Sequence, residues 1–303
     1  MKKNRNAIKN APTSAMRWVL WAALMLFAAT FFLPFAWALI TSVKSYEEYS
    51  IFENIIGLPK SVTFASIFEN FKTAWEQGYA YATVDGEMRY FTIVQQFMHS
   101  LLYAGGCTIT ATMTPCITAY VTARYNFKFS KVVYTIVIFA MILPVVGALP
   151  SEIALTKVLG TYDTFWGLWL QKANFLGTYF LIFFAQFKMI PAEYTEAARI
   201  DGASEFYTMT KVIMPLAKNS IVTVALMNFV TFWNDYQVPM VFLPSRPVLA
   251  LGMFQFSFRV GQVVSSVPMK ISYMIVVVIP ILLLFLVAHK KLMGNISVGG
   301  LKG

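Results

Sequence analysis

Six long apolar segments divide this chain of 303 residues, and they limit its possible folds more than any other feature. They begin near Arg17, Gln96, Lys131, Trp166, Ser220 and Ile271. A helix needs about 20 mainly apolar residues to cross a bilayer, and each segment approaches or exceeds that length. Only 13% of the residues are charged, against roughly a quarter in soluble domains. The sequence therefore predicts an all-α integral membrane protein with six transmembrane helices.

The distribution of basic residues predicts the orientation of these helices. Lys and Arg gather on the cytoplasmic side of membrane proteins. If both termini are cytoplasmic, the majority of the 24 Lys and Arg residues lie on that side, and most of the 14 acidic residues lie outside. We therefore expect an N-in, C-in topology. This topology also explains the net charge of +10, so no nucleic-acid partner is needed.

The same patterns divide the chain into five parts. The first apolar segment extends past twenty residues and has no small-residue cleavage site, so we expect a retained helix, not a signal peptide. The expected parts are a cytoplasmic basic tail (1–16), a first span (17–40), an extracytoplasmic segment (41–95), a core of five spans with a polar loop at 188–219 (96–290), and a cytoplasmic C-terminal tail (291–303).

The second apolar segment, residues 96–123, is rich in Gly, Ala, Ser and Thr. Small residues let helix backbones approach closely where lipid gives no hydrophobic drive for association. The composition predicts a packing helix at the centre of a bundle. Cys107 and Cys116 lie on different parts of this helix, which favours buried apolar fillers over a disulfide or a metal pair.

The polar loop between the fourth and fifth apolar segments has helical character of its own. Pro191 suits the first turn of a helix, and Glu193 suits the positive end of its dipole. Asp201 and Gly202 should end that helix, because Gly readily takes the left-handed closing conformation. Ser204 can cap a second helix. The sequence predicts a helix-turn-helix on the cytoplasmic side.

The first helix of this loop should present a small apolar face with charges at its edge. Tyr194, Ala197 and Ala198 share one face, and Glu196 and Arg199 lie beside it. Such a ridge would fit a groove on another protein. An amphipathic hairpin on the lipid surface is the alternative. The loop has as many acidic as basic residues, so it would have little attraction to anionic lipid.

We find no pattern of catalytic, nucleotide-binding or metal-binding residues in the sequence. Residues 57–61 lack the glycines of a phosphate-binding loop, and Pro59 lacks an N–H that such a loop needs. His99 and His289 are far apart, and no nucleophile–base set is present. The chain is therefore not expected to be an enzyme or to hydrolyse ATP itself.

Asp235 is the one acidic residue inside an expected span. An intramembrane charge is a functional hypothesis by default. Together with Trp233 and Asn234 it could line a substrate pathway, since these side chains offer stacking and hydrogen bonds. A structural or gating role for this group is the alternative that we favour.

Several motifs resemble those of permeases from binding-protein-dependent ABC importers. The sequence Glu196-Ala-Ala-Arg-Ile-Asp-Gly-Ala203, followed by Ile213-Met-Pro-Leu216, resembles the Glu-Ala-Ala loop of that family. From about Phe31 onward the chain is similar to the smaller, six-span member of the maltose-transporter-type sugar permease pair. The other matching motifs are Thr41-Ser-Val-Lys44, Ala119-Tyr120 with Ala123-Arg124, the stretch 159–168, Trp233-Asn-Asp235 with Pro239, and Gly300-Leu-Lys-Gly303.

The resemblance implies that the polar loop is a coupling helix seated in a cleft of a cytoplasmic ATPase subunit. Glu196 would supply the anchoring charge, and Ala197 with Ala198 would form the packed face. Gly202 would be required for the turn. The remaining residues that the resemblance assigns to coupling are Asp201, Ala203 and Pro215.

The resemblance also implies a set of partners and a location. The partners would be a second permease subunit, forming a heterodimer, two copies of an ABC ATPase that binds ATP and Mg, an extracytoplasmic sugar-binding protein, and membrane lipid. The chain itself would hold no cofactor. It would be a multi-pass protein of a prokaryotic inner (cytoplasmic) membrane that imports a carbohydrate, specifically an oligosaccharide.

Three other functions remain open from the sequence. One is import of a non-sugar, such as a glycerol phosphate derivative, by a permease of the same class. Another is secondary transport, against which the single intramembrane carboxylate and the lack of a clear inverted repeat argue. The third is a non-transporting assembly subunit, which would need no coupling loop.

Overall fold

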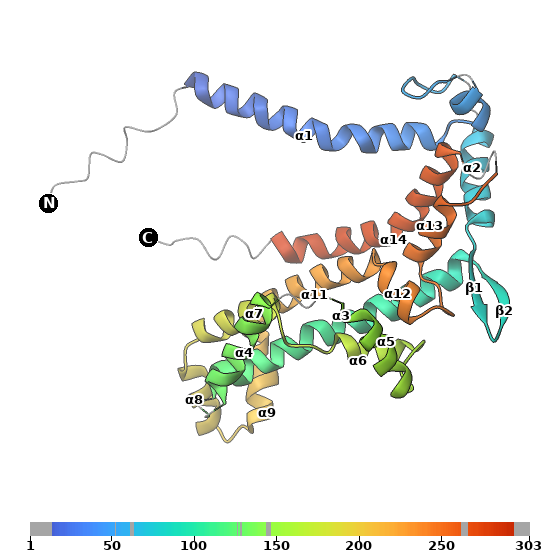
Figure 1. Ribbon diagram of the computed structural model, residues 1–303. Coiled ribbons are helices and arrows are strands. Elements are labelled where there is room, and N and C mark those ends of the chain that lie inside the picture. Colours follow the sequence, from blue (N-terminus) through green and yellow to red (C-terminus); the bar gives the residue numbers. More distant parts are fainter. Residues whose placement is uncertain are drawn as a thin grey trace. The chain divides into compact units, whose positions relative to one another are not determined.

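The computed structural model describes residues 14–51, 53–60, 64–125, 127, 129–143, 147–261 and 266–293 (Figure 1). Most of these residues are helical. The chain divides into two compact units, Met1–Ala74 with Val260–Met274, and Trp75–Arg259 with Ile275–Gly303. The two expected tails, 1–16 and 291–303, fall almost entirely outside the described residues, as does the Gly300–Gly303 motif.

The first unit begins with α1 (Ser14–Ser42), a helix of 29 residues that contains Pro34. The stretch Met16–Ser42 has a mean hydropathy of 2.1 over its most apolar window, and its length and composition suffice to cross a membrane. A π-helical turn, η2 (Glu47–Ile51), follows. The helices α2 (Phe64–Gln77) and α14 (Val267–Met293) each begin in this unit.

Buried polar groups hold the chain together just after α1. The fully buried Lys44 donates from Nζ to the carbonyl oxygens of Asn54 (2.7 Å) and Ile55 (3.2 Å). Asn70 donates from Nδ2 to the carbonyl oxygens of Ser42 and Lys44, each at 2.8 Å. A buried charge is tolerated only when such partners satisfy it. The start of the segment after α1 is therefore folded.

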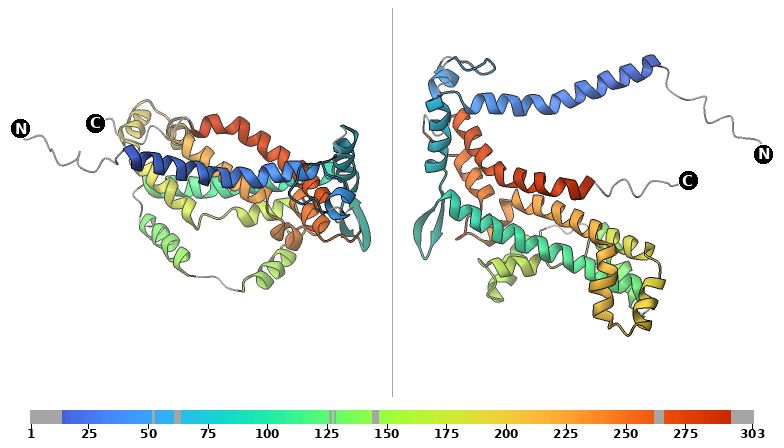
Figure 2. Two further views of the ribbon diagram at one scale, coloured as in Figure 1. Left: turned by 90° about the horizontal axis from the view of Figure 1, so that it is seen from above. Right: turned by 180° about the vertical axis from the view of Figure 1, so that it is seen from behind.

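The second unit is built around α3 (Ile93–Arg124). This helix packs against α6 (Phe165–Lys172), α7 (Thr178–Met189) and α11 (Lys218–Trp233). Figure 2 shows α3 and α11 side by side from two directions. The prediction of a central packing helix is confirmed.

Small residues on α3 allow this close packing. A Cβ at Gly106 would collide with the indole ring of Trp169. That ring donates from Nε1 to the carbonyl oxygen of Leu102 at 3.1 Å. Cys107 and Cys116 are free thiols with fully buried side chains, as expected.

The core of the second unit lies where α3, α7 and α11 meet. Tyr120 of α3 and Phe180, Phe183 and Phe187 of α7 are almost completely buried there, with Val224 of α11. The remaining helices outside the polar loop are α4 (Ser130–Ile142), α5 (Leu149–Val158), α12 (Gln237–Phe242) and α13 (Leu249–Ser257).

A β-hairpin precedes α3, so the expectation of an all-α chain is wrong at this point. Strands β1 (Ala80–Val84) and β2 (Glu87–Phe91) pair antiparallel. Asp85 and Gly86 have φ angles of 55° and 85°, the pair of positive values that a type I′ turn requires. Asp-Gly between short strands is a strong hairpin signal. The prediction treated residues 41–95 only as an extracytoplasmic segment and did not use this signal.

The six-span arrangement remains a prediction. Within the described residues, α1 is the single unbroken helix that is long and apolar enough to cross a membrane. A second candidate is the bent pair Glu205–Leu216 and Lys218–Trp233, and two apolar helices, Ser130–Ile142 and Val267–Leu283, are shorter. The fourth and fifth apolar segments are broken by turns between α6 and α7 and between α11 and α12, and α3 contains buried Ser, Thr and Gln side chains.

Candidate functional site

The polar loop forms a helical hairpin, whose first arm is α8 (Glu193–Ile200). The helix closes with a Schellman motif. The N–H of Gly202 donates to the carbonyl oxygen of Arg199 (3.0 Å), and the N–H of Ala203 donates to that of Ala198 (2.9 Å). Gly202 has a φ of 77°, which residues with a Cβ adopt only at a cost. The turn predicted at this glycine is present.

The second arm runs from Ser204 toward α11. Ser204 Oγ accepts from the N–H of Tyr207 at 3.2 Å, so it caps the arm as predicted. The arm consists of α9 (Glu205–Tyr207), a π-helical stretch η3 (Thr208–Ile213) and α10 (Met214–Leu216), which contains Pro215. It then bends by 78° into α11. We call residues 193–216 the α8–α9 hairpin.

The α8–α9 hairpin is tied to the end of α3 at two points. Glu205 forms an ion pair with Arg199 (2.9 Å) and accepts from the hydroxyl of Tyr125 at 2.5 Å, just beyond the end of α3. Arg124, the last residue of α3, donates to the carbonyl oxygens of Ile190 (2.9 Å) and Pro191 (3.1 Å). Motion of the hairpin would therefore pull directly on α3.

We call the hydrogen bond between Tyr125 and Glu205 the hairpin tether. The pKa values of both groups are shifted. The hydrogen bond from Tyr125 lowers the pKa of the Glu205 carboxyl, and the Arg199 guanidinium lowers it further. Burial, followed by the bond to Glu205, raises the pKa of the Tyr125 hydroxyl. The sequence analysis did not identify this contact, because Tyr125 and Glu205 are 80 residues apart and no local pattern joins them.

A hollow of about 820 Å³ opens between the two arms. Five residues of the expected coupling set line it, together with Tyr194: Ala197, Ala198, Asp201, Gly202 and Ala203. Glu196 and Pro215 are exposed and lie outside this lining. Ala198 is only 8% exposed. The expected apolar face therefore looks into a concave surface and is not a protruding ridge.

Large apolar side chains in and just before the hairpin are exposed. Ile200 is 86% exposed, and Phe206 and Met189 are each 72% exposed. Exposed apolar side chains that lie together mark interaction surfaces. The hairpin thus combines a shaped hollow with exposed apolar side chains.

Trp233 and Asn234 are part of the packed framework around α11. Trp233 is 4% exposed, and its ring packs against those of Phe97 and Phe229, with centroids 5.8 and 5.5 Å away. Asn234 donates from Nδ2 to the carbonyl oxygen of Val230 at 2.8 Å, which closes the end of α11. Burial leaves little of the Trp233 side chain for a ligand, whereas Asn234 is exposed.

Asp235 likewise acts within the framework. Its Oδ2 accepts from the Tyr103 hydroxyl at 2.8 Å. Its Oδ1 accepts from the N–H groups of Gln237 (3.0 Å) and Val238 (3.1 Å), which caps the start of α12. This arrangement favours the structural role over direct substrate contact.

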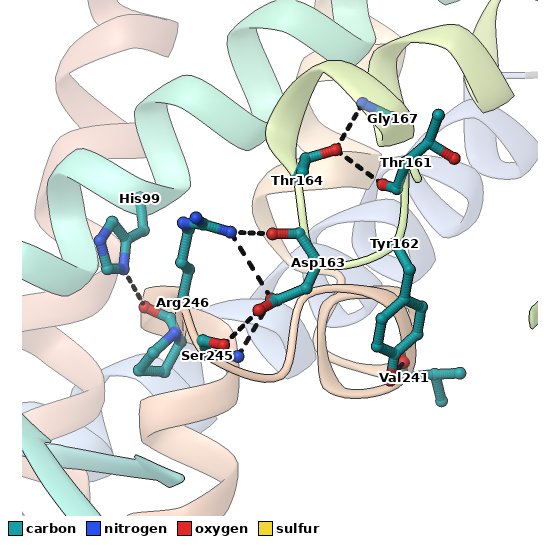
Figure 3. Close-up of polar contacts among 10 residues, drawn as sticks. His99, Thr161, Tyr162, Asp163, Thr164, Gly167, Val241, Ser245 and Arg246 are labelled. Carbon is teal, nitrogen blue, oxygen red and sulfur yellow. Dashed lines mark hydrogen bonds and ion pairs between the residues drawn. The ribbon is translucent and has the colours of Figure 1, made fainter. Parts of the chain in front are cut away.

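A second polar cluster fixes the turn between α5 and α6 to the loop between α12 and α13 (Figure 3). Asp163, which has a φ of 58°, accepts from the Ser245 N–H at 3.1 Å and from the Ser245 hydroxyl, and pairs with Arg246 at 3.6 Å. Its own carbonyl oxygen accepts from Arg246. We call these three residues the Asp163 clamp. The sequence analysis cited this stretch only for its resemblance to a family.

Local hydrogen bonds shape the same turn. Thr164 donates from Oγ1 to the carbonyl oxygen of Thr161 (2.6 Å) and accepts from the N–H of Gly167 (3.1 Å), so it caps α6. A Cβ at Gly167 would strike the carbonyl oxygen of Thr161. Nearby, a ring nitrogen of His99 lies 3.0 Å from the carbonyl oxygen of Pro247. Among the described residues, no group of three or more His, Cys, Asp or Glu could hold a metal.

Comparison with known proteins finds permease proteins that match this chain over most of its length. The chain is 26% identical to the diacetylchitobiose uptake system permease protein NgcG of Streptomyces coelicolor, which covers 92% of this chain and 86% of that protein. It is also 26% identical to the melibiose/raffinose/stachyose import permease protein MelC of Bacillus subtilis, covering 98% and 100% of the two chains. A probable starch degradation products transport system permease protein, AmyC of Thermoanaerobacterium thermosulfurigenes, is 26% identical and covers 89% and 91%.

A solved structure shares the fold. It is a chain of a bacterial ABC transporter involved in the import of the acidic polysaccharide alginate, with a TM-score of 0.73 and 19% identity, covering 92% of this chain and 98% of that one. The family profile described as binding-protein-dependent transport system inner membrane component matches residues 111–290, more than half of the chain. This membrane-embedded chain therefore belongs to the family of binding-protein-dependent transport system inner membrane components, as a permease subunit and not an enzyme.

Proposed function

We propose that this permease subunit imports a carbohydrate, specifically an oligosaccharide, and that its α8–α9 hairpin receives the motion of an ATPase. The names of its relatives support the substrate class, since they include permeases for diacetylchitobiose, for melibiose, raffinose and stachyose, and for starch degradation products. The similarity extends over most of each chain.

The observation that carries the coupling role is the closed hairpin with its uncovered hollow. A coupling element must be stiff, because a flexible one would absorb the motion of its partner. The Schellman closure at Gly202 and the Ser204 cap supply that stiffness. Ala197, Asp201 and Ala203 line the hollow that would receive the ATPase, and the exposed Glu196 would fix the register of docking.

The path from the hairpin into the membrane core runs through α3. ATPase closure would move the α8–α9 hairpin, and Arg124 and Tyr125 would pass that movement to α3. Because α3 packs against α6, α7 and α11, the displacement would reach most of the second unit. Pro215 and the 78° bend after it would let the hairpin and α11 move as separate levers.

The proposal includes the rest of the assembly and its location. A second permease subunit would complete the pathway as a heterodimer, two copies of an ABC ATPase would bind ATP and Mg, and an external binding protein would deliver the sugar. The chain would have six spans in a prokaryotic inner membrane, with both termini and the hairpin on the cytoplasmic side. Secondary transport, the competing function, gives no role to an exposed hairpin of this shape.

The substitution Gly202→Asp tests the coupling role. A side chain at a φ of 77° strains the turn, and the added charge enters the hollow. In the complex purified with its partners and reconstituted in liposomes, we expect ATPase stimulation by binding protein and sugar to fall more than tenfold, while membrane insertion is unchanged.

Gly86→Asp is the matched control. Gly86 has a φ of 85° in the β-hairpin, and neither glycine has a heavy atom within 4 Å of its would-be Cβ. The strain is therefore similar, but the site is remote from the α8–α9 hairpin in the chain. Equal stimulation in the Gly202→Asp variant and the unaltered complex would contradict the coupling role.

A further inference from the structure

We propose that a pocket in the second unit binds a neutral sugar ring during transport, an inference that rests on the proposed carbohydrate function. The pocket measures about 420 Å³ and lies between α3, α5, α6, α7, α11 and α12, within the range of small-molecule sites. We call it the α6–α11 pocket. Its polar lining residues are Glu152, Gln171, Lys172, Asn174, Tyr179 and Asn228.

Asn228 provides a buried amide in the wall of the α6–α11 pocket. It is 5% exposed and donates from Nδ2 to Thr112 Oγ1 at 3.0 Å. An amide carries two N–H donors and an oxygen with two lone pairs. The bond to Thr112 uses one of these positions and holds the side chain in place. The others are the positions that a hydroxyl group entering the pocket would use.

Gln171 provides a second, oriented amide. Its Nε2 donates to Glu152 Oε2 at 3.5 Å. Its Oε1 is buried and, within the described part of the chain, has no hydrogen-bond partner. A buried polar atom without a partner costs free energy, so a donor that reached Oε1 as the pocket changed shape during transport would stabilise it. A sugar hydroxyl both donates and accepts, and it could satisfy Gln171 and Asn228 alike.

Aromatic rings also line the pocket, contributed by Phe175, Tyr179, Phe180 and Phe242. The C–H groups of a sugar ring form an apolar face that gains from leaving water. The lining therefore offers both amide groups and rings, the two kinds of partner that the two chemical faces of a pyranose require.

The charges of the pocket favour a neutral ligand. Glu152 and Lys172 are its two ionisable lining residues apart from Tyr179, and their charges cancel. A phosphate or carboxylate ligand would call for several cationic donors, and it would be repelled by Glu152. This separates a neutral oligosaccharide from the glycerol phosphate derivative that the sequence left open.

The pocket is held in shape at one end and linked to the hairpin at the other. Beside the Asp163 clamp, the N–H of Asp163 donates to the carbonyl oxygen of Phe242 (3.0 Å), and Tyr162 donates from its hydroxyl to that of Val241 (3.0 Å). These bonds fix α12 to the start of α6 (Figure 3). From the pocket, α7 runs to Met189, next to the α8–α9 hairpin. Movement of α7 would therefore alter the pocket.

Thiol protection in the full transporter tests the proposal. Asn174→Cys places a thiol on an exposed pocket residue, and Gln237→Cys places a matched thiol on an exposed residue of α12 outside the lining. Diacetylchitobiose, raffinose and alginate oligosaccharides are supplied with the binding protein, and the sugar that best stimulates uptake by the unaltered complex is then used as protectant. We expect a neutral sugar to be best, and to slow maleimide modification at position 174 at least threefold, with no change at position 237.

A second pair of variants measures how much the Gln171 side chain contributes to sugar transport. Gln171→Ala removes the unpartnered acceptor, and Gln237→Ala removes a comparable amide outside the pocket. We expect Gln171→Ala to lower the sugar uptake rate about three- to tenfold, the range of one lost hydrogen bond, while sugar-stimulated ATPase activity persists. Gln237→Ala should transport normally.

The outcomes distinguish failure of the pocket assignment from failure of the carbohydrate function. Equal modification at position 174 with and without sugar, or unchanged uptake by Gln171→Ala, would overturn the pocket assignment while leaving the carbohydrate function standing. Preference for the acidic oligosaccharide would overturn the neutral-ligand assignment. If the unaltered complex responds to none of these sugars, the carbohydrate function itself fails and the pocket assignment falls with it.

Discussion

The two ends of α3 are held in opposite ways. Near its start, Gln96 donates to the carbonyl oxygens of Gly78 and Phe91, each at 2.8 Å, and Ser100 accepts from the N–H of Leu249 at 2.7 Å. Both side chains are fully or almost fully buried. At its end, Arg124 makes part-buried or exposed bonds to residues 190 and 191, just before the α8–α9 hairpin, and Tyr125 makes an exposed bond to Glu205 within it.

This difference suits two different tasks. A buried hydrogen bond is costly to break, because its groups cannot turn to water instead. An exposed bond competes with water and is worth less, so it can be exchanged for contacts with a partner. The start of α3, with its buried bonds, and the Asp163 clamp, with several part-buried bonds and an ion pair on one residue, thus form a fixed frame. The hairpin forms a surface that can be moved.

The largest effect on stability should come from the fixed frame, through Asp163→Ala. This change leaves the Ser245 N–H and hydroxyl without their acceptor and removes the carboxylate that pairs with Arg246, which should cost about 1–3 kcal/mol. The apparent Tm of the purified complex should fall. Asp85→Ala is the control, because Asp85 also pairs with an arginine, Arg89, but on the surface at 3.9 Å. A similar Tm for both variants would mean that the clamp is no stiffer than an exposed ion pair.

The hairpin tether should give a smaller effect on stability and a clear effect on coupling. Tyr125→Phe removes the bond to Glu205, and one such bond contributes about 0.5–1.5 kcal/mol. We expect sugar-stimulated ATPase activity to fall about two- to tenfold while the apparent Tm changes little. Tyr134→Phe removes a hydroxyl from α4 instead and should leave stimulation intact. A Tm loss as large as that of Asp163→Ala would remove the distinction between frame and hairpin.

The smallest effect is a dependence of the tether on pH. The pKa of Glu205 is lower in the folded chain than in the unfolded one, so ionised Glu205 stabilises the hairpin. That contribution is complete above the ordinary glutamate pKa of about 4.3 and is lost as the pH falls through the lowered folded value. Hydrogen exchange at Gly202 and Ala203, corrected for intrinsic rates, should quicken over this range. The transition should be weaker in Tyr125→Phe, and an identical profile would contradict the tether.

Parts of this structure could be predicted from the chemistry of neighbouring residues in the sequence. The Gly202 turn and the Ser204 cap depend on residues within six positions of each other, and the central place of α3 follows from its small residues. The Asp-Gly hairpin turn was equally local and was overlooked. The shape of the expected coupling face could not be predicted from the sequence. The position of the second arm decides whether Tyr194, Ala197 and Ala198 border a ridge or a hollow.

By itself the sequence determined that this is an integral membrane protein with a polar helical hairpin, because apolar length, small-residue composition and turn chemistry act over short stretches of chain. The permease family followed from the resemblance of its motifs. Only the tertiary structure decided which polar groups meet. Tyr125 joins Glu205 across 80 residues, Ser245 joins Asp163 across 82, and Asn228 joins Thr112 across 116. Such pairs arise when packed helices bring distant residues together, and no pattern along the chain encodes their distance. The hairpin's tether, the clamp and the α6–α11 pocket all depend on them.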